Sequence, residues 1–158
     1  MTEGTSLARQ FQCAFETPFP PGSPFLDGSI RVMKSEVGVE PGAIIFNPEK
    51  LLICVEWEIH GSLAHLICGK WCVCVDFDCV GEGPDFDYDR CRTVEFDCTS
   101  DGKFRECFEV TVKDLPKTNR CTTVCRIIAT VSLLDCRGRP SRIAGFCDAG
   151  IVQFSPAE

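Results

Sequence analysis

The sequence predicts an all-β protein, an antiparallel β-sandwich of the immunoglobulin-like or jelly-roll kind with an extended N-terminal arm. Two observations predict this class. Apolar and polar residues alternate along several segments, which is the period of a strand with one buried face. Clusters of Gly, Pro, Asn and Asp separate these segments, as turns separate strands. The only helical candidate is Thr5–Phe15, so an all-β sandwich is favoured over a mixed fold.

Residues 1–29 differ from the rest of the chain and are predicted to form an extended arm. They contain four prolines and four phenylalanines: Pro18, Pro20, Pro21, Pro24, Phe11, Phe15, Phe19 and Phe25. Proline cannot donate to a sheet ladder and favours extended conformations, so the segment is not expected to be a central strand. Two interpretations stay open. The arm wraps its own domain, residues 30–158, or it docks on a neighbouring subunit.

The predicted strands of the body follow one another between turn signals. A short strand lies within Ile30–Val39 and another at Ala43–Phe46, separated by a Glu-Pro-Gly turn. The strongest strands are at 51–60, 69–80, 91–98 and 104–113. In the first of them one face carries only apolar residues: Leu51, Ile53, Val55, Trp57 and Ile59. The β-branched run 121–135 and the segments 143–147 and 151–154 supply the last strands, so every predicted element of the body is extended.

Length and charge restrict the classes of function. A chain of 158 residues is long enough to bury a core without disulfides, so its 13 cysteines are not explained by small size. Thirteen is an odd number, which leaves at least one sulfur free, metal-bound or paired with another chain. The net charge of −7 argues against nucleic-acid partners. No run of about 18 apolar residues exists, so membrane insertion is not expected.

Several cysteines fall on the polar faces of the predicted strands, where a thiol has little packing value. The candidates for cross-linking are Cys13, Cys54, Cys72, Cys74, Cys91 and Cys107. Cys72 and Cys74 share a face but lie about 6.5–7 Å apart along the strand, so they are expected to bond to adjacent strands or other chains rather than to each other. Cys13, in the arm, is expected to pair with another chain. Cys136 and Cys147 flank a turn and are candidates to close that hairpin.

The sequence offers candidate ligands for two metal sites, and each set also has an interpretation without a metal. Zinc favours Cys and His ligands, and the candidates are His60, His65, Cys68 and Cys72, against two loop histidines and unrelated thiols. Calcium favours carboxylates, and the candidates are Asp85, Asp87 and Asp89, against a solvated acidic edge. Neither spacing matches a known metal motif, so no cofactor is expected.

The sequence contains no phosphate loop, nucleophile elbow or metalloprotease motif, so an enzyme is not expected. We expect a structural protein that assembles with copies of itself into a disulfide-linked surface polymer or filament. The alternatives are a monomeric surface binding module with intrachain disulfides and an optional calcium dependence, and an intracellular zinc or thiol protein. Cysteine usage favours an extracellular, cell-surface or spore-surface location, although the start of the chain has no signal-peptide pattern, and a cytoplasmic location is the alternative.

Overall fold

The computed structural model describes residues 9–37, 44–46, 50–67, 69–80, 90–95, 102–111 and 123–155. These residues form nine strands and one short 3-10 helix, η1 (Ala64–Leu66). The strands are β1 (Arg9–Glu16), β2 (Asp27–Val37), β3 (Ile44–Phe46), β4 (Lys50–His60), β5 (Lys70–Val80), β6 (Arg90–Glu95), β7 (Lys103–Thr111), β8 (Thr123–Leu134) and β9 (Pro140–Ser155). The prediction of an all-β protein is confirmed.

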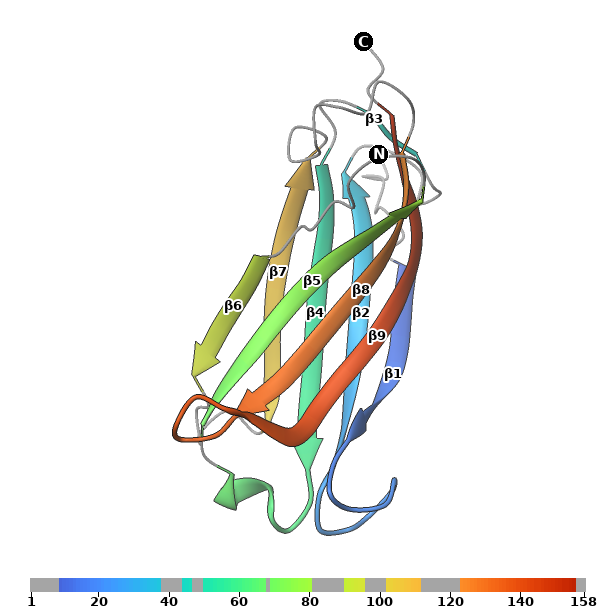
Figure 1. The fold of residues 1–158 in the computed structure, drawn as a ribbon. Helices are drawn as coiled ribbons and strands as arrows, with labels where there is room; N and C mark the ends of the chain where they lie inside the picture. Colours follow the sequence, from blue (N-terminus) through green and yellow to red (C-terminus); the bar gives the residue numbers. More distant parts are fainter. Residues whose placement is uncertain are drawn as a thin grey trace, which may run out of the picture.

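The strands form one continuous sheet in the order β6-β5-β8-β9-β1-β2-β4-β7 (Figure 1). All neighbours are antiparallel except β3, which pairs with β9 in parallel. The two halves are joined by β1, because Arg9–Ala14 pairs with β2 whereas Phe15 and Glu16 pair with β9. The predicted sandwich of two separate sheets is therefore not confirmed. The observed form is a single sheet curled into a half-barrel.

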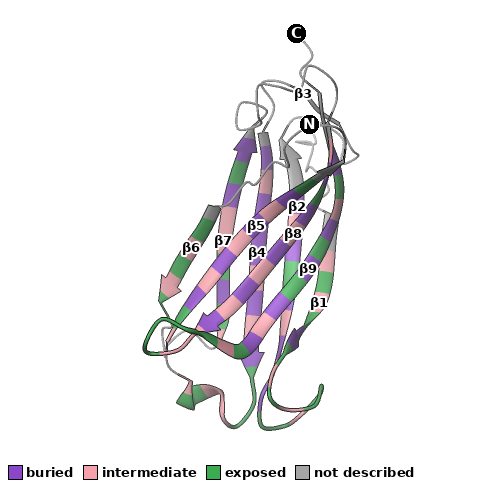
Figure 2. Cartoon of the chain, viewed as in Figure 1, coloured by how far each residue is buried: buried purple, intermediate pink, exposed green. Residues whose placement is uncertain are grey.

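The inner faces of the two halves enclose the core (Figure 2). The apolar face predicted for 51–60 is buried at every position, from Leu51 to Ile59. On β5 the inward residues Trp71, Val73, Val75 and Phe77 are buried as well. The Trp71 ring lies 6.0 Å from the Trp57 ring and 5.6 Å from the Phe104 ring, centroid to centroid, so strands from opposite halves meet in one aromatic cluster.

The N-terminal segment contributes to this sheet. The helix considered for Thr5–Phe15 is wrong, since residues from Arg9 onward form strand β1. Its inward positions follow the strand period: Phe11 and Cys13 pack against the core and Phe15 is 5% exposed. The four prolines lie between β1 and β2, where no ladder hydrogen bonds are needed. Within the described residues, the predicted arm thus supplies a strand and a loop of the domain itself.

The two edge strands, β6 and β7, come close to each other without backbone pairing among the described residues. Arg92 on β6 bridges them: its Nη1 donates to Glu106 Oε2 at 3.0 Å and to the carbonyl oxygen of Cys107. Its guanidinium also lies 4.4 Å from the Phe108 ring centroid. Glu106, which interrupts the apolar row of β7, therefore serves as an anion for Arg92. A side-chain contact holds the open side of the half-barrel.

The β8–β9 connection is held by Asp135. Its Oδ1 accepts hydrogen bonds from the main-chain N–H groups of Arg139 at 2.9 Å and Arg137 at 2.8 Å, and the Arg139 Nε lies 3.4 Å from Oδ2. These N–H groups, that of Arg139 first, hold the pKa of the Asp135 carboxyl below its usual value. Gly138 supplies the positive φ of +76° that the turn requires. After this turn β9 continues to Ser155, and its register on β8 shifts between Asp148 and Ile151, the place where the sequence suggested an interruption.

Candidate functional site

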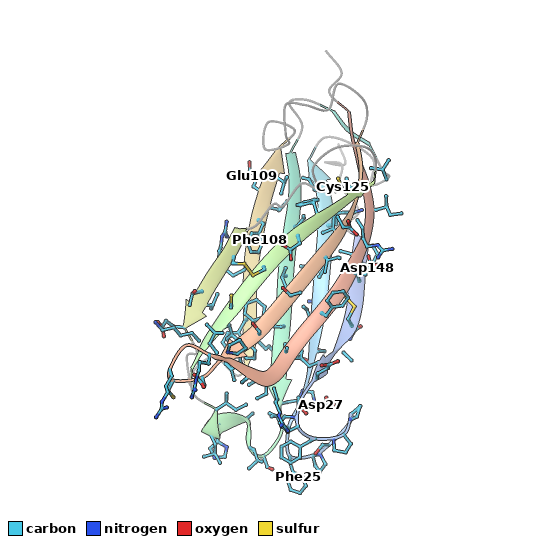
Figure 3. The ribbon with its side chains drawn as sticks, viewed as in Figure 1. Phe25, Asp27, Phe108, Glu109, Cys125 and Asp148 are labelled. Atoms are coloured by element: carbon cyan, nitrogen blue, oxygen red, sulfur yellow. A yellow bond between two sulfur atoms is a disulfide. The ribbon has the colours of Figure 1, made fainter. Side chains whose placement is uncertain are left out.

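The functional candidates of this chain are its sulfur atoms, and the described residues contain three disulfides with both partners placed (Figure 3). Cys54–Cys107 and Cys74–Cys91 join residues that stand directly opposite each other in the sheet register, with Cα separations of 4.0 and 4.2 Å. The third disulfide, Cys13–Cys147, has a Cα separation of 5.5 Å. All three are intrachain cross-strand bonds, one of the arrangements that the sequence left open.

The three disulfides lie at the two end strands of the sheet order and at the β1–β9 junction. Cys74–Cys91 fastens edge strand β6 to β5, its single backbone neighbour, and Cys54–Cys107 fastens edge strand β7 to β4. Cys13–Cys147 joins β1 to β9 beside the point where β1 leaves the β9 ladder for β2. A covalent bond thus supports both ends of the main strand order and the place where β1 changes partner.

The Cys13–Cys147 pairing differs from two expectations. Cys13 was expected to bond another chain, and Cys147 was a candidate partner for Cys136 across the β8–β9 turn. The structure places Cys13 on a strand adjacent to β9 and not in a free arm, which brings it to Cys147. Cys147 is fully buried, whereas Cys136 is exposed in the turn. Strand alternation could not reveal this contact because the two residues are 134 positions apart.

Cys54 was predicted to face solvent among charges, but it is only 3% exposed. Cys54 lies on the outer face of β4, as predicted. It shares this face with Glu56 and Glu58, which are half-buried. The cross-strand bond to Cys107 and the side chain of Arg105, whose Nη2 lies 3.6 Å from Cys54 Sγ, cover the sulfur. Cys125 is fully buried and disulfide-bonded, and Cys79 stands opposite it in the register.

Cys72 is a half-buried free thiol beside a disulfide. Its Sγ lies 3.9 Å from the Sγ of Cys74, and the sulfur atoms of Cys72, Cys74 and Cys91 all lie within 4.8 Å of one another. The residues facing this cluster across the register are hydroxyl-bearing: Thr93 and Ser132 beside Cys72, and Thr130 beside Cys74. We call Cys72, Cys74 and Cys91 the sulfur cluster. Among the described residues it is the one group of three or more metal-ligand side chains.

The other predicted ligands are placed elsewhere or not described. His60 is exposed at the end of β4, with its Nε2 4.0 Å from Asp27 Oδ2, and His65 is exposed on η1. No group of three ligands among the described residues includes either histidine. Cys68 and the calcium candidates Asp85, Asp87 and Asp89 lie outside the described residues.

Sequence reasoning did not anticipate two charged features. An outer groove of about 500 Å³ over β2, β4 and β7 carries Arg31 and Arg105, both paired with Glu56. Lys34 is 2% exposed, and its Nζ donates to the carbonyl oxygen of Ile151 at 3.1 Å, which ties β2 to β9. Lys34 follows Ile30 and Val32 at the inward period of its strand, and this was the available signal.

Comparisons of the chain with protein families, with characterised proteins and with solved structures find no match. Among the described residues, no helix has the length and apolar character needed to cross a membrane.

Proposed function

We propose that this chain is a non-enzymatic structural protein of an oxidising extracellular, cell-surface or spore-surface environment, and that it assembles with copies of itself through disulfides. The observation that carries the proposal is the position of the disulfides, which hold both edge strands and the β1–β9 junction. Disulfides of this kind form and persist in oxidising compartments.

The physical case concerns how a sheet fails. Edge strands have one ladder neighbour and open first under heat, denaturant or pulling, and they are also the places where proteases gain access. Fastening β6 and β7 covalently makes this opening require bond cleavage. A domain built in this way suits a load-bearing or exposed role. In the outer groove, Arg31 and Arg105 both pair with the single carboxylate of Glu56.

The case for self-assembly rests on cysteine number and placement. Intrachain pairs consume an even number of cysteines and the chain has 13, so at least one sulfur per chain remains for an interchain bond. Cys72 is a thiol of this kind, half-buried on the outer face of β5 near the edge of the sheet. Two chains that meet along this edge would bring such thiols together, and oxidation by dioxygen or a disulfide would join them.

The test is denaturing electrophoresis, with and without reductant, after free thiols have been alkylated. We expect a reducible dimer for the native protein, because one interchain bond per chain joins two chains, and loss of that dimer in Cys72→Ser. Higher rungs of a ladder would require a second interchain cysteine. Cys136→Ser, which removes the exposed cysteine of the β8–β9 turn beside Lys70 and Glu95, is the comparison variant and should retain the dimer. A monomer that runs faster without reductant, in all three proteins, would overturn assembly.

That last outcome would favour the second candidate, a monomeric surface binding module. It is supported by the intrachain nature of the three described disulfides and by the outer groove, whose charged rim suits a polar ligand. The ion pairs of Glu56 with Arg31 and Arg105 supply its test, since Glu56→Gln would alter ligand retention and leave the disulfides intact.

A further inference from the structure

We infer that Cys72, Cys74 and Cys91 form a redox-controlled site for a soft divalent metal ion, of which Zn²⁺ is the physiological representative. The site is closed while Cys74 and Cys91 are bonded to each other and opens when that disulfide is reduced. The inference goes beyond the proposed structural role and does not depend on self-assembly.

The spacing of the sulfur atoms fits zinc. Zn–S bonds of about 2.3 Å in a tetrahedron require sulfurs about 3.8 Å apart. Cys72 Sγ and Cys74 Sγ are 3.9 Å apart, already at the edge length of such a site. The sequence argued against a bond between these two cysteines, because same-face neighbours on a strand are too far apart for a disulfide. A metal ion spans the longer distance that a disulfide cannot.

The third ligand comes from the neighbouring strand. Cys91 on β6 faces Cys74 on β5 in the register, and its sulfur is within 4.8 Å of that of Cys72. Two ligands on one strand and a third on the next form a triangle on the outer face, and the fourth coordination position points to solvent. Hydroxyls of Thr93, Ser132 and Thr130 occupy the facing positions and are suited to donate to thiolates.

Reduction is expected to reach this disulfide before the other two placed disulfides. Cys91 is exposed and Cys74 half-buried, so neither of its sulfurs is closed off. Each of the other two disulfides contains a buried half: Cys147 is 0% and Cys54 is 3% exposed. Thiol–disulfide exchange requires access of the attacking thiolate, and exposed disulfides are the labile ones.

The chemistry balances with an external thiol as the reductant. Two molecules of thiol reduce the Cys74–Cys91 bond by two electrons, give two protein thiols and leave as one disulfide. Zn²⁺ then binds the three sulfurs of the cluster as thiolates and releases three protons, and water completes the coordination. When a small-molecule disulfide takes two electrons from the Cys74 and Cys91 thiolates, the protein disulfide forms again, two small thiolates leave and the metal is expelled, so the site reports the redox state of its surroundings.

The experiment uses the full chain, treated anaerobically with limiting dithiol until peptide mapping shows that Cys74–Cys91 alone among the placed disulfides is open. Reductant is removed, and Co²⁺ is titrated as a spectroscopic probe, followed by displacement with Zn²⁺. We expect one Co²⁺ per chain, with intense thiolate-to-cobalt charge-transfer bands and the visible bands of tetrahedral cobalt. The untreated, oxidised protein should show neither.

Variants identify the ligands. Cys72→Ser and Cys91→Ser should each weaken binding by more than about 100-fold, because even changes outside the ligand set cost roughly 10–100-fold. Cys136→Ser, at a cysteine outside the sulfur cluster, should bind as the native chain does. Circular dichroism of each reduced sample verifies that the sheet persists. Three results would each overturn the inference. Cys72→Ser could bind cobalt as tightly as the native chain, binding could appear only after the buried disulfides open, or the folded reduced chain could bind none.

Assembly is read by light scattering from the same preparation before reductant is added. A monomer at that stage whose reduced form binds cobalt would overturn the proposed polymer and leave the metal site standing. A polymer whose reduced form binds none would do the reverse.

Discussion

Loss of the Cys13–Cys147 disulfide should cost this protein more stability than loss of either other placed disulfide. In the chain-entropy account, a cross-link stabilises by restricting the unfolded chain, and the effect grows with the length of the closed loop. The three bonds close loops with sequence separations of 134, 53 and 17 residues. The corresponding contributions are about 5, 4 and 3 kcal/mol, each an upper value for a loop closed on its own.

The assay compares paired alanine variants, which leave no unpaired thiol behind and bury no hydroxyl. Cys13→Ala/Cys147→Ala and Cys74→Ala/Cys91→Ala are unfolded in guanidinium chloride and followed by the fluorescence of Trp57 and Trp71, both of which are buried. The first pair should lose about 2 kcal/mol more than the second. For a domain of this size that difference corresponds to a shift of roughly 4–8 °C in Tm.

Position in the sheet strengthens the expectation. Residues 9–14 of β1 have no backbone pairing with β9, so the disulfide is the covalent link across that part of the junction. Cys54→Ala/Cys107→Ala provides an intermediate case. If the three pairs lost equal stability, or if the 17-residue loop mattered most, the entropic reasoning would be refuted and local contacts would govern instead.

Three further changes test the other contacts that shape the half-barrel. Arg92→Ala should lower the free energy of unfolding by about 1–2 kcal/mol, because it leaves Glu106 without its cation; an unchanged denaturant midpoint would mean that the β6–β7 contact contributes nothing. Gly69→Ala should lower the free energy of unfolding clearly more than Gly138→Ala. Both glycines have positive φ, but a Cβ at Gly69 collides with a carbonyl oxygen, whereas one at Gly138 meets nothing within 4 Å. Gly138→Ala should lose only about 1 kcal/mol, and equal losses in the two variants would contradict the collision. Asp135→Asn should flatten the acid limb of the curve of unfolding free energy against pH. The pKa of Asp135 is lowered in the folded state, so its carboxylate stabilises the fold above the unfolded-state pKa. This stabilisation is lost as the pH falls through the folded-state pKa, below about 4. Identical acid limbs in urea titrations of the two proteins would contradict this.

Strand alternation predicted the inner face of this fold well. From Leu51 to Ile59 and from Trp71 to Phe77, every second residue is buried as the pattern required. This works because the side-chain period of a strand is a local property that needs no knowledge of the partner strand. The same locality limits what the sequence predicts at the N-terminus. Phe11, Cys13 and Phe15 also follow the period of two, but the prolines that come after them suggested an arm.

Strand order and sulfur pairing depend on contacts between distant segments, and the sequence could not supply them. Cys13 meets Cys147 because β1 sits between β2 and β9, an adjacency that no local pattern encodes. Likewise, the candidate zinc ligands His60 and His65 are close to Cys72 in sequence but lie outside its cluster. Cys91 is 19 positions from Cys72 in sequence, yet it faces Cys74 from the adjacent strand.

The sulfur cluster stands apart from the other disulfides in what its oxidation state controls. Opening Cys13–Cys147 or Cys54–Cys107 would release a structural constraint next to a buried sulfur, and the fold opposes it. Opening Cys74–Cys91 frees the short edge strand β6, which the Arg92 contacts to Glu106 and Phe108 continue to hold against the body. The edge can therefore change its redox state without losing its place, and this combination of an accessible disulfide, an adjacent thiol and an independently anchored strand is what a reversible thiol site requires.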